Sequence, residues 1–409
     1  ADTVDPGTTL FIVASKSGTT LETMSFFRIL WDRVAGALDD PGSRFIAITD
    51  PDSPLAHLGN DRGFRAVFLA PSDVGGRFSA LIEFGLVPAA LVGIDLGRLL
   101  AGADEAAFSC GPKVAVSENP ALRLGAALGE FALSGRDKIV FNPEPVFASF
   151  PAWIEQLIAE SLGKDGMGIL PVADGRAPSA PDRLPFTIGL SGATPSEGPS
   201  ISMTLDDAYD LGGAMYIFEM ATAAAGAVLG VHPFNQPDVQ LAKSLAHTAM
   251  TEGLAGFDVT EWTLDDDTTA DNLRVLLSSA APGGYVAIQA YLDPTGATAQ
   301  RLDAIADVIA GTTGAAVTIG YGPRFLHSTG QFHKGGPDGG VFLQIVDHPA
   351  RDLDVPETDY ALGKLITAQS FGDQAALRDR GRPVGMVCLG DASSADLPRL
   401  KAMIETSSR

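Results

Sequence analysis

Short apolar runs alternate along the chain with amphipathic stretches of helical period. In the first hundred residues the pattern predicts strands over Leu10–Ala14, Phe45–Thr49 and Ala66–Ala70 and a helix over about Leu21–Leu38. Further strands are expected at Lys138–Asn142, Gly168–Val172, Phe186–Leu190, Tyr285–Tyr291, Ala316–Ile319, Val341–Ile345 and Val384–Leu389. Helices are expected at Pro120–Ser134, Pro151–Leu162 and from Gly212 to about Gly230. This alternation favours an α/β fold of doubly wound parallel sheets, which bind ligands at the carboxyl ends of their strands.

The chain is too long for one hydrophobic core, because it has 409 residues. We expect one α/β domain over 1–115, a second over 116–254 and a C-terminal α/β region over 255–409. A linker is expected near 101–118. The chain begins abruptly, close to a core strand, so we expect the first domain to be incomplete at its N-terminus.

The net charge and the cysteine content of the chain limit its classes of binding partner and its compartment. A net charge of −22 makes nucleic acid and anionic membranes poor partners, so the few cations inside glycine-rich motifs stand out. The two cysteines, Cys110 and Cys388, give neither a disulfide framework nor a metal-ligand spacing, and a reducing cytoplasm is the simplest compartment. The longest apolar run, Gly212–Val231, contains Glu219, so we expect a buried helix rather than a membrane span.

The segment Ser15–Thr20 reads Ser-Lys-Ser-Gly-Thr-Thr and lies between a predicted strand and a predicted helix. Backbone N–H groups at a helix N-terminus bind anions, and the hydroxyls and the Lys16 ammonium could complete a phosphate cradle. The spacing is not that of a nucleotide P-loop. An ordinary Ser/Thr-capped helix start is the alternative.

A second motif, Gly75-Gly76-Arg77, also follows a strand. The two glycines allow a positive φ and close approach of the backbone to a ligand. Arg77 could then stabilise a developing oxyanion. A surface turn with an exposed arginine is the alternative.

The third motif is a helix in which one face carries the carboxylate of Glu160. The residues that share this face are Trp153, Gln156, Leu157, Glu160 and Lys164. Burial beside the apolar stripe and the negative end of the helix dipole would both raise the pKa of Glu160, which suits a general base. An ion pair between Glu160 and Lys164 on a solvated helix face is the alternative.

Two later segments also attract attention. Pro233–Lys243 places a proline-rich connector before a helix whose second turn carries Lys243, which otherwise reads as a surface lysine. Gly320–Pro337 is glycine-rich and cationic and contains His327 and His333. It could form an anion site or a lid, or else a buried structural loop. The spacing of its histidines is not typical of zinc, so we expect no metal.

Taken in order, these motifs resemble those of the phosphoglucose isomerase family. Ser15–Thr20 with Glu22-Thr23 resembles its phosphate loop, and Gly75–Ser79 with Gly85-Leu86 resembles its Gly-Gly-Arg signature. Glu160–Lys164 resembles the segment of its catalytic glutamate, and Phe234–Lys243 resembles its lysine motif. Gly322–Pro337 resembles the C-terminal part of the isomerase half in transaldolase/phosphoglucose isomerase fusions.

The resemblance implies two flavodoxin-like sugar isomerase (SIS) domains, over 1–115 and 116–254, and the interconversion of glucose 6-phosphate and fructose 6-phosphate. Glu160 would move the proton between C2 and C1, Arg77 would stabilise the cis-enediolate, and Lys243 would assist ring opening. The residues implied in substrate binding are Ser15, Lys16, Ser17, Thr19, Thr20, Gly76 and Gln236. The resemblance implies no metal or redox cofactor.

Departures from the family leave alternatives open. The family's ring-opening histidine has no clear match, and His232, His327 or His333 could substitute for it. The family suggests a homodimer, and the fused proteins carry an N-terminal transaldolase domain that this chain lacks. A non-catalytic SIS module that binds a sugar phosphate, or an inactive fragment, is the competing interpretation. The joint presence of Glu160, Arg77 and Lys243 favours the isomerase.

Overall fold

The computed structural model describes residues 4–173, 176–190, 199–252, 259–348, 351–390 and 395–407. The chain forms two compact units. Unit 1 comprises residues 1–108, 209–216 and 352–362, and unit 2 comprises the remainder of the chain. The predicted boundary after residue 254 lies outside the described residues.

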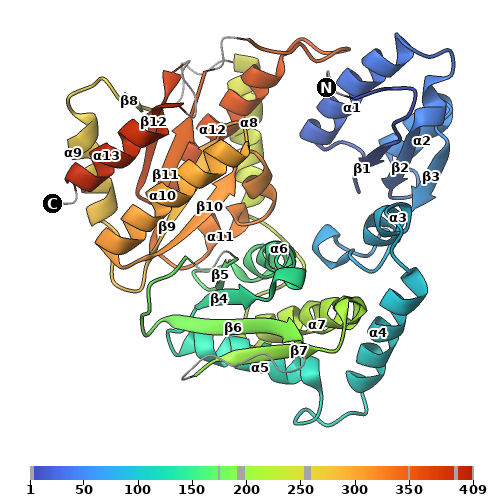
Figure 1. Cartoon of the computed structure of the whole chain (residues 1–409), viewed down its shortest axis with the longest axis horizontal. Coiled ribbons are helices and arrows are strands. Elements are labelled where there is room, and N and C mark those ends of the chain that lie inside the picture. The colour runs from blue at the N-terminus through green and yellow to red at the C-terminus, as the bar shows by residue number, and fades with distance from the viewer. Residues whose placement is uncertain are drawn as a thin grey trace. The chain divides into compact units, whose positions relative to one another are not determined.

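Unit 1 is built on a parallel sheet in the order β1 (Phe11–Ala14), β2 (Phe45–Thr49) and β3 (Ala66–Leu69) (Figure 1). The helices α1 (Leu21–Ala35) and α2 (Pro54–Asp61) follow the first two strands. All five residues of β2 are buried, because it is the central strand. Its core contains the mutually packed rings of Phe27, Trp31, Phe45 and Phe64.

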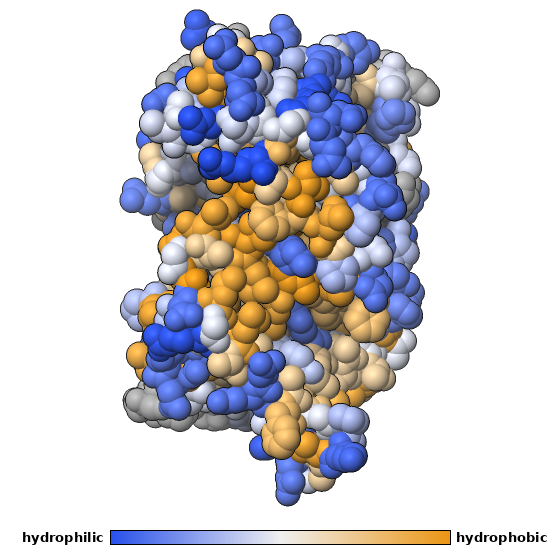
Figure 2. Space-filling view, turned by 90° about the vertical axis from the view of Figure 1, so that its right-hand side faces the viewer, coloured by the Kyte–Doolittle hydropathy of each residue, from blue (hydrophilic) through white to orange (hydrophobic). Residues whose placement is uncertain are grey.

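Unit 1 continues through two helices, α3 (Glu83–Leu91) and α4 (Leu96–Ser109). The predicted linker over 101–118 is therefore wrong in its first half, because the alanine-rich segment 101–109 completes α4. Although α3 is strongly apolar, none of its described residues is fully buried. Leu91 and Val92 expose 52% and 79% of their surface at its end. Figure 2 shows hydrophobic residues gathered over much of one face of the molecule.

The first sheet of unit 2 has four parallel strands in the order β5 (Leu170–Val172), β4 (Lys138–Pro143), β6 (Arg183–Leu190) and β7 (Ile201–Leu205). Three helices belong to this region: α5 (Pro120–Leu133), α6 (Phe150–Leu162) and α7 (Leu211–Leu229). Rings from α6, β6 and α7 pack together in its core, since Phe218 contacts both Phe150 and Phe186. The helix over Ala208–Leu229 is long and apolar enough to cross a membrane by length and composition alone, a test that core helices also pass.

The second sheet of unit 2 is also parallel, in the order β10 (Ala316–Tyr321), β9 (Tyr285–Tyr291), β11 (Gly340–Val346), β12 (Val384–Cys388) and β8 (Glu261–Thr263). Its helices are α9 (Thr269–Ser278), α10 (Gly296–Thr313), the short α11 (Gly330–Gly335), α12 (Leu362–Asp379) and α13 (Leu397–Ser407). The helix α10 lies beside α13 (Figure 1).

The two sheets of unit 2 share one hydrophobic core. Its cluster contains Val140 and Leu170 from the first sheet, Ala287 and Phe342 from the second, and Phe332 from α11. This packing matters for function, because α11 is thereby held against α6, the helix that carries Glu160.

The predicted α/β class with parallel sheets and flanking helices is confirmed. The prediction missed β7 and β8, two short strands at sheet edges. Each of the three sheets lies within one of the three predicted regions, whereas the division of the chain into three domains stays a prediction.

Candidate active site

The loop Ser15–Thr20 leaves the carboxyl end of β1 and is fixed to the neighbouring strand. The Thr49 hydroxyl donates to the Ser15 carbonyl at 2.7 Å, and the Asp50 N–H donates to the Lys16 carbonyl at 3.2 Å. Gly18 has a φ of +67°, and a Cβ there would lie 2.6 Å from the Leu55 nitrogen. The loop therefore has one tightly defined shape.

The hydroxyls of this loop are paired with one another. Ser15 Oγ lies 2.9 Å from Thr20 Oγ1, and Ser17 Oγ lies 2.9 Å from Thr19 Oγ1. Thr20 occupies the N-cap position of α1 but makes no side-chain cap bond to any described residue. The loop is thus not the ordinary Ser/Thr-capped helix start that was the alternative. Its hydroxyls lie at a helix N-terminus, where an anion is favoured.

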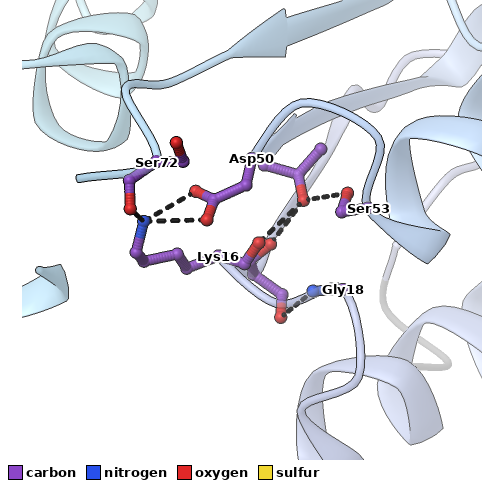
Figure 3. A network of polar contacts seen from close by, with 7 residues as sticks. Lys16, Gly18, Asp50, Ser53 and Ser72 are labelled. Atoms are coloured by element: carbon purple, nitrogen blue, oxygen red, sulfur yellow. Dashed lines mark hydrogen bonds and ion pairs between the residues drawn. The ribbon is translucent and has the colours of Figure 1, made fainter. Parts of the chain in front are cut away.

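The Lys16 ammonium contacts the segments that follow the two neighbouring strands (Figure 3). It pairs with both Asp50 carboxylate oxygens, at 3.0 and 2.8 Å, and donates to the Ser72 carbonyl at 2.7 Å. Lys16 therefore connects the loop after β1 with the segments after β2 and β3. The ammonium thus acts as a brace that holds the loop, and its predicted role as a phosphate ligand stays a prediction.

Gly75-Gly76-Arg77 lies in unit 1, and Gly76 and Arg77 form part of a short 3-10 helix, η2 (Gly76–Phe78). Gly75 does not adopt the positive φ that a glycine allows, since its φ is −66°. A Cβ on either glycine would meet no described atom within 4 Å, so the space beside the glycines stays open for a ligand. The exposed-arginine alternative is wrong, because only 8% of Arg77 is exposed.

Glu160 lies in the last turn of α6 and is 9% exposed. The Gln156 amide donates to Glu160 Oε2 at 3.4 Å and to the His327 carbonyl at 2.8 Å. Lys164 is 2% exposed, and its ammonium donates to the His232 carbonyl. The alternative of an ion pair on a solvated helix face is therefore wrong.

The glycine-rich run near residue 330 is interior. All six residues of α11 are buried, which excludes the lid for this part of the segment. His333 is buried with Nδ1 3.1 Å from the Gln289 amide, and burial lowers its pKa well below the usual value. A neutral, enclosed ring does not suit the predicted ring-opening role. His232, which is exposed, and His327, which is half-buried, remain candidates.

The lysine motif lies in unit 2. Gln236 is exposed in the connector before α8 (Val239–Glu252), and Lys243 lies in the second turn of that helix. The Lys243 side chain is outside the described residues. Sequence reasoning missed Asp238 between them, a buried carboxylate that pairs with Arg380 and accepts from the Gln331 amide at 2.6 Å.

One group of potential metal ligands lies away from these motifs. Single ligand atoms of Glu261, His348 and Cys388 lie within 4.8 Å of one another. His348 Nε2 is 3.2 Å from the Glu261 carboxylate, and this polar contact accounts for their proximity. We assign no metal to this group.

Each unit thus carries its own share of the candidate residues. Unit 1 holds the loop Ser15–Thr20 and the buried Arg77. Unit 2 holds the buried Glu160 with its amide partner, the helix α8 that carries Lys243, and the two candidate histidines His232 and His327. A hydroxyl-rich loop at a helix N-terminus and a buried carboxylate, in an α/β fold, are the groups that an isomerase of phosphorylated sugars requires.

Comparison with known proteins gives the family. The family model described as phosphoglucose isomerase matches residues 1–168. A glucose-6-phosphate isomerase from Rubrobacter xylanophilus is 31% identical over 306 residues, which cover 61% of this chain and 70% of that protein. The chain belongs to the phosphoglucose isomerase family.

Two further curated relatives align over smaller shares of both chains. Glucose-6-phosphate isomerases from Heliobacterium modesticaldum and Enterococcus faecalis are 32% and 29% identical, each over 56% of this chain and over 63% and 64% of their own lengths. A hypothetical protein from Thermus thermophilus is similar in structure, with a TM-score of 0.56 and 25% identity over 61% of this chain and 73% of that one. The chain thus spans 63% to 70% of these curated relatives.

Proposed function

We propose that this chain catalyses the interconversion of glucose 6-phosphate and fructose 6-phosphate. The observation that carries the proposal is Glu160, a buried carboxylate at the end of α6 that accepts a hydrogen bond from Gln156. The names of the relatives support the substrate. Glycolysis and gluconeogenesis in the cytoplasm are the setting that this reaction implies.

The chemistry needs one base that moves one proton. Once the sugar ring is open, the Glu160 carboxylate takes the proton from C2, and the electron pair of the broken C–H bond forms the C1–C2 double bond of an enediolate. The negative charge collects on the oxygen that was the C1 carbonyl, where the permanently charged Arg77 guanidinium stabilises it. The proton of the C2 hydroxyl then moves to the C1 oxygen, which becomes a hydroxyl, and the negative charge moves to the C2 oxygen. Glu160 returns its proton to C1 as the C2 oxygen becomes the carbonyl of the ketose.

The remaining residues bind and orient the substrate. The hydroxyls of Ser15, Ser17, Thr19 and Thr20 hold the phosphate at the start of α1, in a loop whose shape Lys16 and Asp50 maintain. Gly76 and Gln236 line the substrate, and Lys243 assists ring opening together with His232 or His327. Arg77 and the loop belong to unit 1, and Glu160 belongs to unit 2.

A sugar-phosphate sensor is the competing function. A sensor would need the Ser15–Thr20 loop but neither Glu160 nor Arg77. Nuclear magnetic resonance of glucose 6-phosphate incubated with the chain separates the two, because an isomerase produces fructose 6-phosphate and a sensor only broadens the substrate signals. Unphosphorylated glucose is the control. Binding without any turnover would overturn the isomerase proposal.

We also propose that the chain is a homodimer. An apolar helix that buries none of its described residues, α3, leaves a hydrophobic surface that a second copy would cover. Val92, 79% exposed at the end of this helix, is the residue of choice for testing it.

A further inference from the structure

The segment Arg324–Gly335, which we call the brace segment, contacts the catalytic helix at two points. It comprises η6 (Arg324–His327) and α11. Near its start, the His327 carbonyl accepts a hydrogen bond from Gln156, the residue whose amide also reaches Glu160. Near its end, the Gln331 amide donates to the Gly163 carbonyl at 2.9 Å, directly after the last turn of α6.

Gln331 makes three hydrogen bonds with one fully buried amide. Its Nε2 donates to the Gly163 carbonyl and to Asp238 Oδ2 at 2.9 and 2.6 Å, and its Oε1 accepts from the Asp238 N–H at 2.9 Å. Both amide hydrogens face acceptors and the oxygen faces a donor, so only one orientation of the amide fits. The residue therefore acts as a fixed link rather than as a space-filling side chain.

The link joins the two catalytic segments of unit 2. Gly163 lies three residues after Glu160, and its carbonyl is one of the helix-end acceptors that α6 itself cannot satisfy. Asp238 immediately precedes α8, lies two residues after Gln236 and lies five residues before Lys243. The Gln331 amide thus links the C-terminal end of α6, which carries Glu160, to the N-terminal end of α8, which carries Lys243.

The packing around this link leaves no room for adjustment. A Cβ on Gly163 would lie 2.4 Å from the Phe332 Cα. A Cβ on Gly335 would lie 2.4 Å from Asp238 Oδ2 and 2.8 Å from both Gln331 Nε2 and the Gly163 carbonyl oxygen. Gly163, at the end of α6, and Gly335, in the Gly320–Pro337 run, are therefore required by these close contacts.

We propose that Gln331 is a positioning residue that holds Glu160 in register with the Gln236–Lys243 segment, and that the brace segment thereby makes the C-terminal α/β region part of the catalytic apparatus. The inference rests on the proposed isomerase function. A base displaced by about 1 Å can lose on the order of 10²-fold in rate. Loss of the Gln331 link should therefore reduce kcat while the phosphate loop of unit 1 keeps its contacts.

The test compares Gln331→Met with Gln344→Met in the isomerase assay. Both glutamines are fully buried amides, but Gln344 lies on β11, donates to Asp373 at 3.1 Å and makes no hydrogen bond to Gly163 or Asp238. Methionine keeps the length of the side chain and removes its hydrogen bonds. We expect Gln331→Met to lower kcat about 10- to 100-fold with less than a threefold change in KM, on the scale expected for a misplaced base. Gln344→Met should change kcat less than threefold.

A variant at the protein surface tests the same link in case Gln331→Met fails to fold. Arg380 pairs with the second Asp238 oxygen and has a side chain that is 42% exposed, so Arg380→Gln removes support for Asp238 without opening the core. We expect a fall in kcat of roughly 2- to 10-fold. Arg378→Gln, in the last turn of α12 just before Arg380, is the control. A wild-type chain that is inactive would refute the isomerase proposal itself. An active wild type, with Gln331→Met and Arg380→Gln matching their controls in kcat, would overturn the role of Gln331 alone.

Discussion

The carboxyl group of Glu219 in α7 should make the stability of the protein depend on pH. Burial raises the pKa of Glu219 from 4.5 to about 8. Its Oε1 is buried and has no hydrogen-bond partner among the residues that the structure describes. Such a carboxyl stays protonated in the folded chain over a pH range in which the unfolded chain ionises it.

The sign and the size of the effect follow from linkage. Below the unfolded pKa of 4.5, Glu219 is protonated in both the folded and the unfolded state, so it does not change the free energy of unfolding. As pH rises from there toward about 8, the unfolded state alone loses the proton, so the folded state loses stability by about 1.4 kcal/mol per pH unit. Between about pH 5.5 and about pH 8.5 the loss amounts to about 3 kcal/mol, because the folded carboxyl begins to ionise near the upper limit.

Glu219→Gln removes this titration and keeps the shape of the side chain. We expect the variant to gain about 3 kcal/mol relative to wild type on going from about pH 5.5 to about pH 8.5. Any fixed cost of the new amide cancels, since it is the same at both pH values. Urea unfolding followed by circular dichroism measures the difference. Glu130→Gln, on the exposed face of α5, is the control and should give equal changes at both pH values.

A Glu219→Gln effect that is the same at both pH values would refute the reasoning. It would mean that the carboxyl is ionised in the folded chain at neutral pH, so that water or a cation reaches it.

Two further predictions concern unit 1. Lys16→Met should raise KM for glucose 6-phosphate about tenfold or more with a smaller change in kcat, because it releases the loop from Asp50 and Ser72. Lys113→Met, which lies outside the loop, is the control. An unchanged KM in the isomerase assay would contradict the role of Lys16 in holding the loop. Val92→Asp places a charge on the apolar surface near α3, so it should convert the proposed dimer to a monomer. Sedimentation velocity measures the change, and a wild-type chain that sediments as a monomer would contradict the dimer.

The regular parts of the fold could be predicted because burial and sequence period agree there. The fully buried strands β2 and β9 coincide with the predicted runs Phe45–Thr49 and Tyr285–Tyr291. The strands β7 and β8 were missed because neither is a continuous apolar run: β7 reads Ile-Ser-Met-Thr-Leu, with polar residues at every second position, and β8 has only three residues. The predicted linker is wrong in its first half because the alanines of this segment are strong helix formers and extend α4 to Ser109.

The motifs of the site could be located from sequence, but not the partners of their side chains. Lys16 carries a charge that suits a phosphate, yet Asp50, 34 residues later in the chain, takes its ammonium. Gln331 reads as one polar residue in a glycine-rich run, and only the fold brings it to Gly163 and Asp238. Contacts between residues so distant in sequence leave no local pattern to read.

The most direct test of the isomerase assignment is the effect of Glu160→Gln on turnover. The conversion of glucose 6-phosphate in D2O should place deuterium at C1 of the fructose 6-phosphate formed, because the base exchanges part of the transferred proton with solvent. Glu160→Gln should lower kcat and this incorporation by roughly 10²- to 10⁴-fold while substrate binding persists, which is the range for loss of a general base. Glu155→Gln, on the same helix, should behave as wild type. Undiminished turnover by Glu160→Gln would contradict the account.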